Sequence, residues 1–192
     1  MRQLLNVYLL NKIEPMKILR SIVLVVVLLS TAAISAQSKK EEKLIVDAHK
    51  AKQALLKQDQ GLEAFFESAA GYVLFPNVGK GGFIIGGASG NGVVYENDAI
   101  AGYANLKKLN IGLQAGGQAI IEVIFFETEE DLAEFKEDNF QFAAEASAVA
   151  VKSGIAYNAK YKDGVAVFAL PKAGLMADAS VGGQKIEFTP VK

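Results

Sequence analysis

Few side chains in this chain of 192 residues could carry out chemistry. There is no cysteine, which excludes a thiol nucleophile, a disulfide framework and a cysteine-based metal site. His49 is the single histidine, so a multi-histidine metal cluster is excluded and one candidate imidazole base remains. Because His49 stands among lysines in a segment with helical periodicity, we interpret it as a solvent-facing residue.

Two glycine-rich segments resemble functional loops without meeting their requirements. Gly79–Gly82 reads Gly-Lys-Gly-Gly, but a phosphate-binding loop needs glycine where Leu74 stands and Ser or Thr after the lysine. Gly87–Asn91 contains Ser89 but lacks the final glycine of a nucleophile elbow. Neither segment therefore predicts a catalytic or nucleotide-binding site.

The acidic run between Glu127 and Asp138 is a third candidate, in this instance for a cation site. Its first members stand where a helix N-terminus favours negative charge, and the others fit a solvated helix face. The absence of cysteine, the single histidine, the two glycine-rich segments and the acidic run together predict no catalytic residue, no metal site and no cofactor. We therefore expect a protein that is not an enzyme. A hydrolase using Ser89 or His49 is the alternative. The net charge of −1 also gives no general attraction to nucleic acid.

One pattern carries a binding hypothesis. Lys43, Lys50 and Lys57 are seven residues apart, so they project from nearly one face of a predicted helix over residues 39–58. An apolar stripe runs beside them, formed by Leu44, Ala48, Ala51 and Leu55, and further lysines flank them at Lys39, Lys40 and Lys52. This arrangement is typical of a helix lying on an anionic membrane surface. The alternative is an amphipathic helix packed on the protein with its lysines in water.

The N-terminal segment has the pattern of an export signal. Lys17 and Arg20 precede the uninterrupted apolar run Ile22–Leu29, and small residues follow up to Ala36, where we predict cleavage. The apolar run is shorter than the roughly 20 residues that span a membrane, although an uncleaved anchor is the alternative. Residues 1–15 fit an upstream extension of the start. We expect an exported, periplasmic or secreted protein that is not a lipoprotein, with a domain over residues 37–192.

The glycine distribution divides this domain. All eighteen glycines lie from Gly61 onward, after the lysine-bearing helix. A short second helix is predicted around Leu62, Phe65 and Phe66, and β-type segments follow from Gly71. Those segments are Tyr72–Phe75, Gly82–Ile85, Val93–Tyr95, Ile120–Phe126, Val165–Phe168 and Lys185–Phe188. The fold class is therefore α+β, with a glycine-rich antiparallel sheet or barrel-like β core, an N-terminal amphipathic helix pair and one inserted helix.

Two local predictions accompany this fold. Asn91-Gly92 lies between two β-type segments and predicts a hairpin turn. Thr128 and Asp131 have the spacing of a capping box at the start of the inserted helix, whose apolar face holds Leu132 and Phe135. After that helix, the alternation of apolar residues from Phe140 to Val151 favours a strand.

Several segments, taken in order, resemble the SYLF domain, a lipid-binding family shared by bacterial exported proteins, plant zinc-finger proteins and a yeast cortical actin-patch protein. The segments are Ala69–Pro76, Lys80–Gly87, Gly90–Val94 and Gly112–Gln118. The resemblance extends over about residues 40–190. Tyr95–Ala99 departs from it, because the family has a Trp-Ser-x-Pro-like segment there and this chain has no tryptophan.

The resemblance implies a non-enzymatic protein that binds anionic phospholipid, as eukaryotic members bind phosphoinositides with the help of a basic amphipathic helix. That property maps onto Lys43, Lys50 and Lys57, with Phe65 and Phe66 expected to insert into the membrane or anchor the helix pair. The expected partners are anionic lipid headgroups at a membrane surface. The alternative is a structural or protein-interaction module of the cell envelope without lipid binding.

Overall fold

The computed structural model describes residues 38–137, 140–142 and 149–191. The predicted export signal over residues 1–36, and residues 143–148 of the segment predicted as a strand, lie outside these ranges. The chain divides into two units, Met1–Lys43 and Leu44–Lys192. In the first unit residues 38–43 are helical, and in the second this helix continues to residue 58 and is followed by all the other elements.

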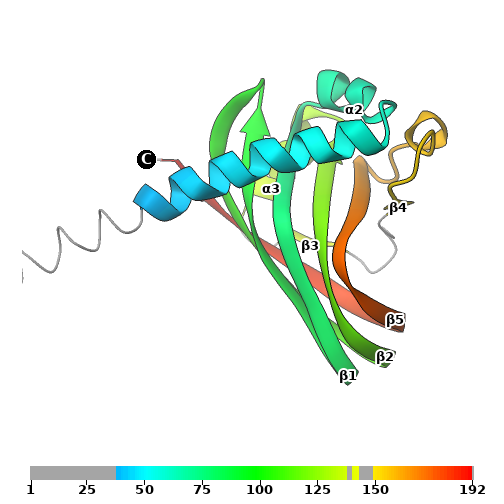
Figure 1. Ribbon diagram of the computed structural model, residues 1–192. Coiled ribbons are helices and arrows are strands. Elements are labelled where there is room, and N and C mark those ends of the chain that lie inside the picture. The colour runs from blue at the N-terminus through cyan, green and yellow to red at the C-terminus, as the bar shows by residue number, and fades with distance from the viewer. Residues whose placement is uncertain (1–37, 138–139, 143–148, 192) are drawn as a thin grey trace, which may run out of the picture. The chain divides into compact units, whose positions relative to one another are not determined.

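The second unit is an α+β fold, as predicted. Its elements in chain order are α2 (Leu62–Ser68), β1 (Gly71–Glu96), β2 (Ala99–Phe126), α3 (Glu129–Lys136), β3 (Phe140–Phe142), β4 (Val149–Ala150), the 3-10 helix η1 (Ala156–Asn158) and β5 (Val165–Pro190). The described strands form a five-stranded sheet in the order β1-β2-β5-β3, with β4 paired to β5 (Figure 1). Along this path the sheet is open. The β1–β2, β2–β5 and β3–β5 pairs are antiparallel, but β4 runs parallel to β5, so the sheet is mixed.

Three very long strands replace the shorter ones expected from the sequence. β1 contains the predicted strands Tyr72–Phe75, Gly82–Ile85 and Val93–Tyr95 in one uninterrupted strand, and β5 likewise contains both predicted closing strands. The glycines between them bend the strand instead of ending it, because a residue without Cβ allows bends and bulges in a sheet. Register shifts in the β1–β2 pairing at Phe75/Val78 and at Phe83/Ile85 mark such irregularities.

The hairpin turn does not lie at Asn91-Gly92, so that prediction was wrong. Both residues are inside β1, paired with Asn105 and Ala104 of β2. The chain turns instead at Asn97 and Asp98, whose φ angles are +50° and +60°. Two consecutive positive φ values are what a tight hairpin turn requires, and Asn and Asp adopt them more readily than most residues do.

Gly92 has a packing role instead. A Cβ atom placed there would lie 2.7 Å from a ring carbon of Phe75 and 3.1 Å from the carbonyl oxygen of Leu74. The C-terminal half of β1 therefore packs closely against its N-terminal half at this point. Only glycine permits this approach, because it has no Cβ.

We expect Gly92→Ala to lower the free energy of unfolding by about 1–3 kcal/mol, the usual cost of overpacking a well-packed interior. Gly79→Ala is the matched control in the same strand, because a Cβ there would meet nothing within 4 Å. Urea denaturation followed by circular dichroism measures both. Equal stability of the two variants would contradict the close approach of the two halves.

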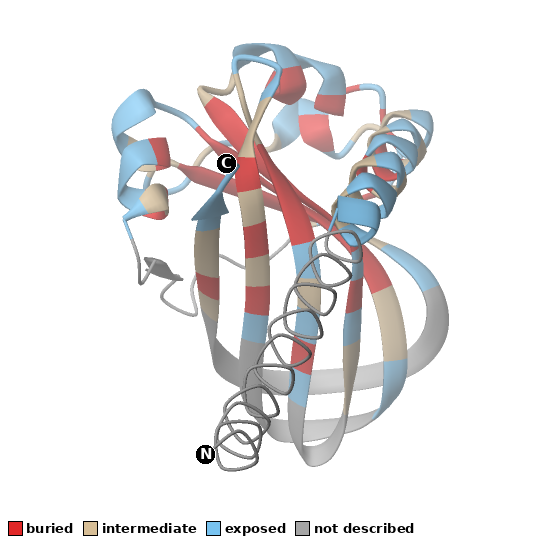
Figure 2. Ribbon diagram, turned by 90° about the vertical axis from the view of Figure 1, so that its left-hand side faces the viewer, coloured by how far each residue is buried: buried red, intermediate tan, exposed pale blue. Residues whose placement is uncertain are grey.

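Side chains on opposite faces of the long strands enter two separate cores. Tyr72 and Leu74 of β1 belong to the first core, whereas Val73 and Phe75 belong to the second, as period-2 alternation requires. The first core is covered by the 38–58 helix through Ala48, Ala51 and Leu55, and by α2 through Leu62, Phe65 and Phe66. Figure 2 shows buried positions on the parts of the strands that lie beside these helices.

The second core is closed by α3, which buries Leu132 and Phe135 as predicted. The predicted capping box is confirmed. The Asp131 backbone N–H donates to Thr128 Oγ1 at 3.2 Å, and the Thr128 backbone N–H donates to Asp131 Oδ2 at 3.0 Å. The start of α3, immediately after β2, is thus fixed by side chains of its own first turn.

Candidate functional site

The 38–58 helix presents a basic outer face. From Leu44 onward, the exposed residues before its last position are Val46, His49, Lys50, Gln53 and Lys57. Residues three, four or seven positions apart share one face of an α-helix, so these residues form one face of it. The buried Ala48, Ala51 and Leu55 form the opposite face. Lys50 and Lys57 therefore point away from the sheet, as predicted from their spacing. Lys43, in the first unit, is also exposed.

Lys52, predicted to flank this face, has a different environment. Its Nζ lies 4.4 Å from the centroid of the Phe66 ring and 5.2 Å from that of Tyr72, and it donates a hydrogen bond to Tyr72 Oη at 3.2 Å. Burial raises the pKa of the Tyr72 hydroxyl, with smaller contributions from Tyr95 and Asp98. Lys52 thus fastens the helix to the aromatic side of the first core by cation–π contacts.

Phe65 and Phe66 lie in that core, with 8% and 7% of their surface exposed. Their ring centroids lie 5.5 Å and 4.8 Å from the centroid of Phe125 on β2. The expectation that these rings insert into a membrane does not fit this burial, since neither ring is presented at the surface. Their contacts are those of anchors that hold α2 on the sheet, the other role considered for them. The helical spacing of Leu62, Phe65 and Phe66 already indicated a buried face, but it could not show which residues the rings contact.

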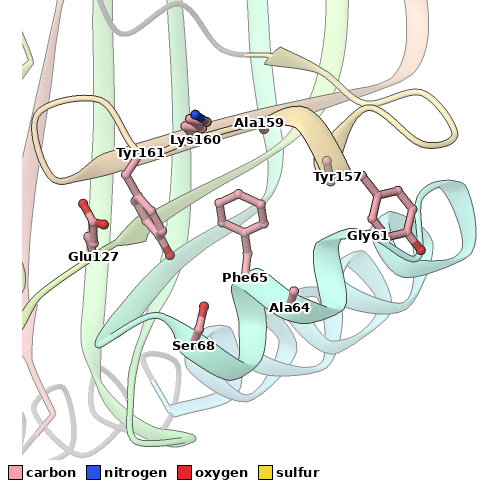
Figure 3. Close-up of a pocket in the computed structure, with 10 residues that line it drawn as sticks. Gly61, Ala64, Phe65, Ser68, Glu127, Tyr157, Ala159, Lys160 and Tyr161 are labelled. Carbon is pink, nitrogen blue, oxygen red and sulfur yellow. The ribbon is translucent and has the colours of Figure 1, made fainter.

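A cavity of about 520 Å³ lies between α2 and the segment that follows η1 (Figure 3). One wall is the face of α2 with its preceding residue, and the other is the chain from Ala156 to Tyr161. The lining residues are Gly61, Ala64, Phe65, Ser68, Glu127, Ala156, Tyr157, Ala159, Lys160 and Tyr161. The surface is mostly small and aromatic, with polar groups concentrated in a few places, as in sites for small molecules.

One end of this cavity is polar. Figure 3 shows the hydroxyl groups of Tyr161 and Ser68 turned toward each other, with the Glu127 side chain on the far side of Tyr161 from Phe65. Burial raises the pKa of Tyr161 to about 12; the nearby Ser68 hydroxyl lowers it and the charge of Glu127 raises it further. The Tyr161 hydroxyl is buried and has no well-formed hydrogen bond to any residue that the structure describes. It therefore has hydrogen-bonding capacity left for another group.

The 154–158 segment, which forms one end of the cavity wall, is held by Asp59. This carboxylate is 2% exposed and accepts hydrogen bonds from the backbone N–H of Gly61 at 3.0 Å and of Ala156 at 2.8 Å. Burial on its own would raise the pKa of Asp59. The backbone N–H groups of Ala156 and Gly61, together with those of Gly154 and Ile155, outweigh this effect and lower it below 3.8.

The other candidates for chemistry remain isolated. The His49 ring is exposed and lies 3.1 Å from the Gln53 amide nitrogen, and Ser89 is exposed on β1. Among the residues that the structure describes, no three potential metal-binding side chains cluster. Within the same ranges, every helix is too short or too polar to cross a membrane.

A known protein family matches the part of the chain that contains most of β2 and all of β5. The family model described as "Las17-binding protein actin regulator", Ysc84, matches residues 107–190, which run from the middle of β2 to the end of β5. This is the SYLF family that the glycine-rich segments resemble. Residues 107–190 therefore resemble a SYLF domain. That family consists of lipid- or actin-related modules and is not known as enzymatic.

A relative from Aeromonas veronii supports the same family. It is called "Beta cell expansion factor A" and is 28% identical to this chain over 133 residues. The alignment covers 68% of this chain and 50% of the relative, so the chain spans about half the length of that protein.

The sequence pattern indicated neither the role of Asp59 nor the cavity beside α2. Asp59 reads as an ordinary polar residue at a helix end, because its partner Ala156 is 97 residues away. Tyr157 and Tyr161 stand in a segment without periodicity, and nothing local places them against α2. The one local signal is that Tyr157 and Tyr161 stand between Gly154 and Gly164. This composition favours a loop but does not predict a cavity.

Proposed function

We propose that this protein is a non-enzymatic, exported module that binds anionic phospholipid surfaces through the outer face of its 38–58 helix. Lys50 and Lys57 would neutralise lipid headgroups, and Lys43 is the third lysine in the same heptad spacing. The observation that carries the proposal is the exposure of Lys50 and Lys57 while the opposite side of the helix is buried.

The charge distribution supports this assignment. From Leu44 to the end of the helix, the exposed positions include Lys50 and Lys57 but no acidic residue, and Asp47 is half-buried. A lysine near an anionic membrane surface contributes about 1 kcal/mol. Two lysines would therefore provide weak, salt-sensitive binding, strengthened by Lys43. Val46, with 47% exposure on the same face, adds one apolar contact with the headgroup region.

The test is co-sedimentation of the Gln37–Lys192 protein with vesicles of phosphatidylglycerol and phosphatidylcholine, or of phosphatidylcholine alone. We expect pelleting with the anionic vesicles only, and its loss at high salt because exposed charges are then screened. Changing Lys43, Lys50 and Lys57 to Glu should abolish pelleting, and the Lys50→Glu/Lys57→Glu pair should weaken binding by at least tenfold.

The matched control is Lys152→Glu/Lys162→Glu, which changes the net charge equally at two exposed lysines that are not part of the helix. If this control loses binding as strongly as the helix variant, overall charge and not the helix face drives the interaction. If no variant pellets, including the unmodified protein, a protein partner in the cell envelope becomes the better function.

A further inference from the structure

Two exposed apolar side chains lie together on the turn that contains η1. Ile155 is 37% exposed and Tyr157 is 74% exposed, whereas Ala156 between them is buried. Single apolar residues are common on protein surfaces and need no explanation. Two of them on one short turn, on either side of a buried residue, form a small apolar patch, which we call the 155–157 patch.

Hydrogen bonds fix the backbone of the turn that carries this patch. The buried Asp59 carboxylate accepts from the Ala156 backbone N–H at 2.8 Å. Within the turn, the Asn158 N–H donates to the Ile155 carbonyl oxygen at 3.2 Å, and the Ala159 N–H donates to that of Ala156 at 3.1 Å. The two apolar side chains are therefore presented on an ordered backbone, so a partner would bind them without first having to order the turn.

The same contacts place the patch next to the end of the lysine-bearing helix. Asp59 directly follows the 38–58 helix, and Lys57 is the last lysine of its exposed face. A Cβ atom at Gly61 would lie 3.2 Å from Cδ2 of Tyr157, and Figure 3 shows Tyr157 beside Gly61. The chain thus brings an apolar patch and the end of a basic helix face together, although the two are about a hundred residues apart in the sequence.

The chemistry of the patch fits the surface of a membrane. Tyrosine is enriched where a bilayer meets water, because its ring is apolar and its hydroxyl group is polar. From Val151 to Lys162 the sequence contains three lysines and no acidic residue. Nothing in this segment therefore repels anionic lipid headgroups, and its positive charge complements them.

We propose that the 155–157 patch is a second membrane contact of this protein, in which Ile155 and Tyr157 enter the headgroup region of an anionic bilayer. This inference rests on the function proposed above. The lysines of the helix attract the bilayer, and the two apolar side chains add a contribution that does not depend on charge. Two such side chains are too few to hold the protein on a membrane alone, so their effect adds to that of the lysines.

The first test places a fluorescent reporter at the patch. The chain has no tryptophan, so Tyr157→Trp introduces a single one. Ala133→Trp is the matched control at an exposed position of α3, the helix that closes the second core. With vesicles of phosphatidylglycerol and phosphatidylcholine, the emission of Tyr157→Trp should shift to shorter wavelength and should be quenched when brominated lipids replace the ordinary ones. Ala133→Trp should show neither change.

The outcomes separate this inference from the lipid-binding proposal. If Tyr157→Trp pellets with the anionic vesicles but its emission does not change, the second contact is wrong while the lysine face still binds lipid, and a protein becomes the better partner for the patch. If the unmodified protein does not pellet, both proposals fail.

The second test removes the apolar side chains without changing the net charge. Ile155→Ser/Tyr157→Ser should weaken binding to the same anionic vesicles by about tenfold, because two apolar groups no longer leave water on binding. The salt dependence of binding should stay as it is, whereas Lys50→Glu/Lys57→Glu should reduce it. Ala133→Ser is the matched control and should bind as the unmodified protein does, and circular dichroism checks that each variant is folded. Equal binding by the double serine variant and Ala133→Ser would overturn the inference.

Discussion

Replacing Phe125 with Ala should destabilise the protein by about 3–5 kcal/mol, the cost of truncating a fully buried phenylalanine in a tight core. Phe125 is 0% exposed and stands at the centre of the aromatic cluster that joins β2 to α2. Its centroid lies within 6 Å of four other rings, those of Phe65, Phe66, Tyr72 and Phe168. Deleting it would leave a cavity that these rings cannot fill without moving α2.

Phe125→Leu is the graded control, and it should cost clearly less because most of the volume is retained. Chemical denaturation followed by tyrosine fluorescence measures both variants, and the absence of tryptophan makes that signal direct. Since most domains of this size are stable by only 5–15 kcal/mol, Phe125→Ala should shift the midpoint strongly. A loss below 1 kcal/mol would show that α2 is not anchored through this ring.

The second large effect concerns Asp59 and depends on pH. Asp59→Asn should lower the free energy of unfolding at pH 7 by about 2–3 kcal/mol, because buried backbone N–H groups of Gly61 and Ala156 lose a charged acceptor. The variant keeps the size of the side chain, so the loss reports the carboxylate itself. The 154–158 segment should also become more mobile, which hydrogen exchange would detect.

The sign of the pH dependence follows from the lowered pKa of Asp59. In the unfolded chain this carboxyl titrates near 3.8, and in the folded protein it titrates lower because of the four backbone N–H groups. Its stabilising contribution is therefore complete above about pH 5, decreases as the pH falls through the unfolded pKa, and is lost below the folded pKa. Urea denaturation at pH 7, 5, 4 and 3 should show the two proteins converging only in acid. A constant difference at every pH would contradict this assignment.

The local elements of this protein could be predicted because their causes are local. The buried stripe of the 38–58 helix, the capping box of Thr128 and Asp131, and the apolar run Ile120–Phe126 all follow from residues close together in sequence. That last run is apolar at nearly every position because β2 is buried on both faces, with Phe125 in one core and Phe126 in the other.

Strand length and turn position could not be predicted in this way. Asn91-Gly92 has the composition of a hairpin turn, yet the return of β1 against Phe75 makes this glycine a packing residue within a strand. The turn at Asn97 and Asp98 carries weaker local preferences and was not identified. A glycine in the sequence is compatible with a turn, a bend in a strand or a close contact. Only the residues that pack against it in the folded protein distinguish these three roles.

The sequence by itself determined the fold class, the SYLF resemblance and the exposure of Lys50 and Lys57, because periodicity and ordered motifs are properties of neighbouring residues. Only the tertiary structure decided that Phe65 and Phe66 are core residues, that Lys52 rests on aromatic rings, and that Asp59 holds a segment 97 residues away. It also brought Glu127, Ser68 and Tyr161 to one end of a cavity. The physical reason is that such contacts join segments distant along the chain, and no local pattern records which of them meet.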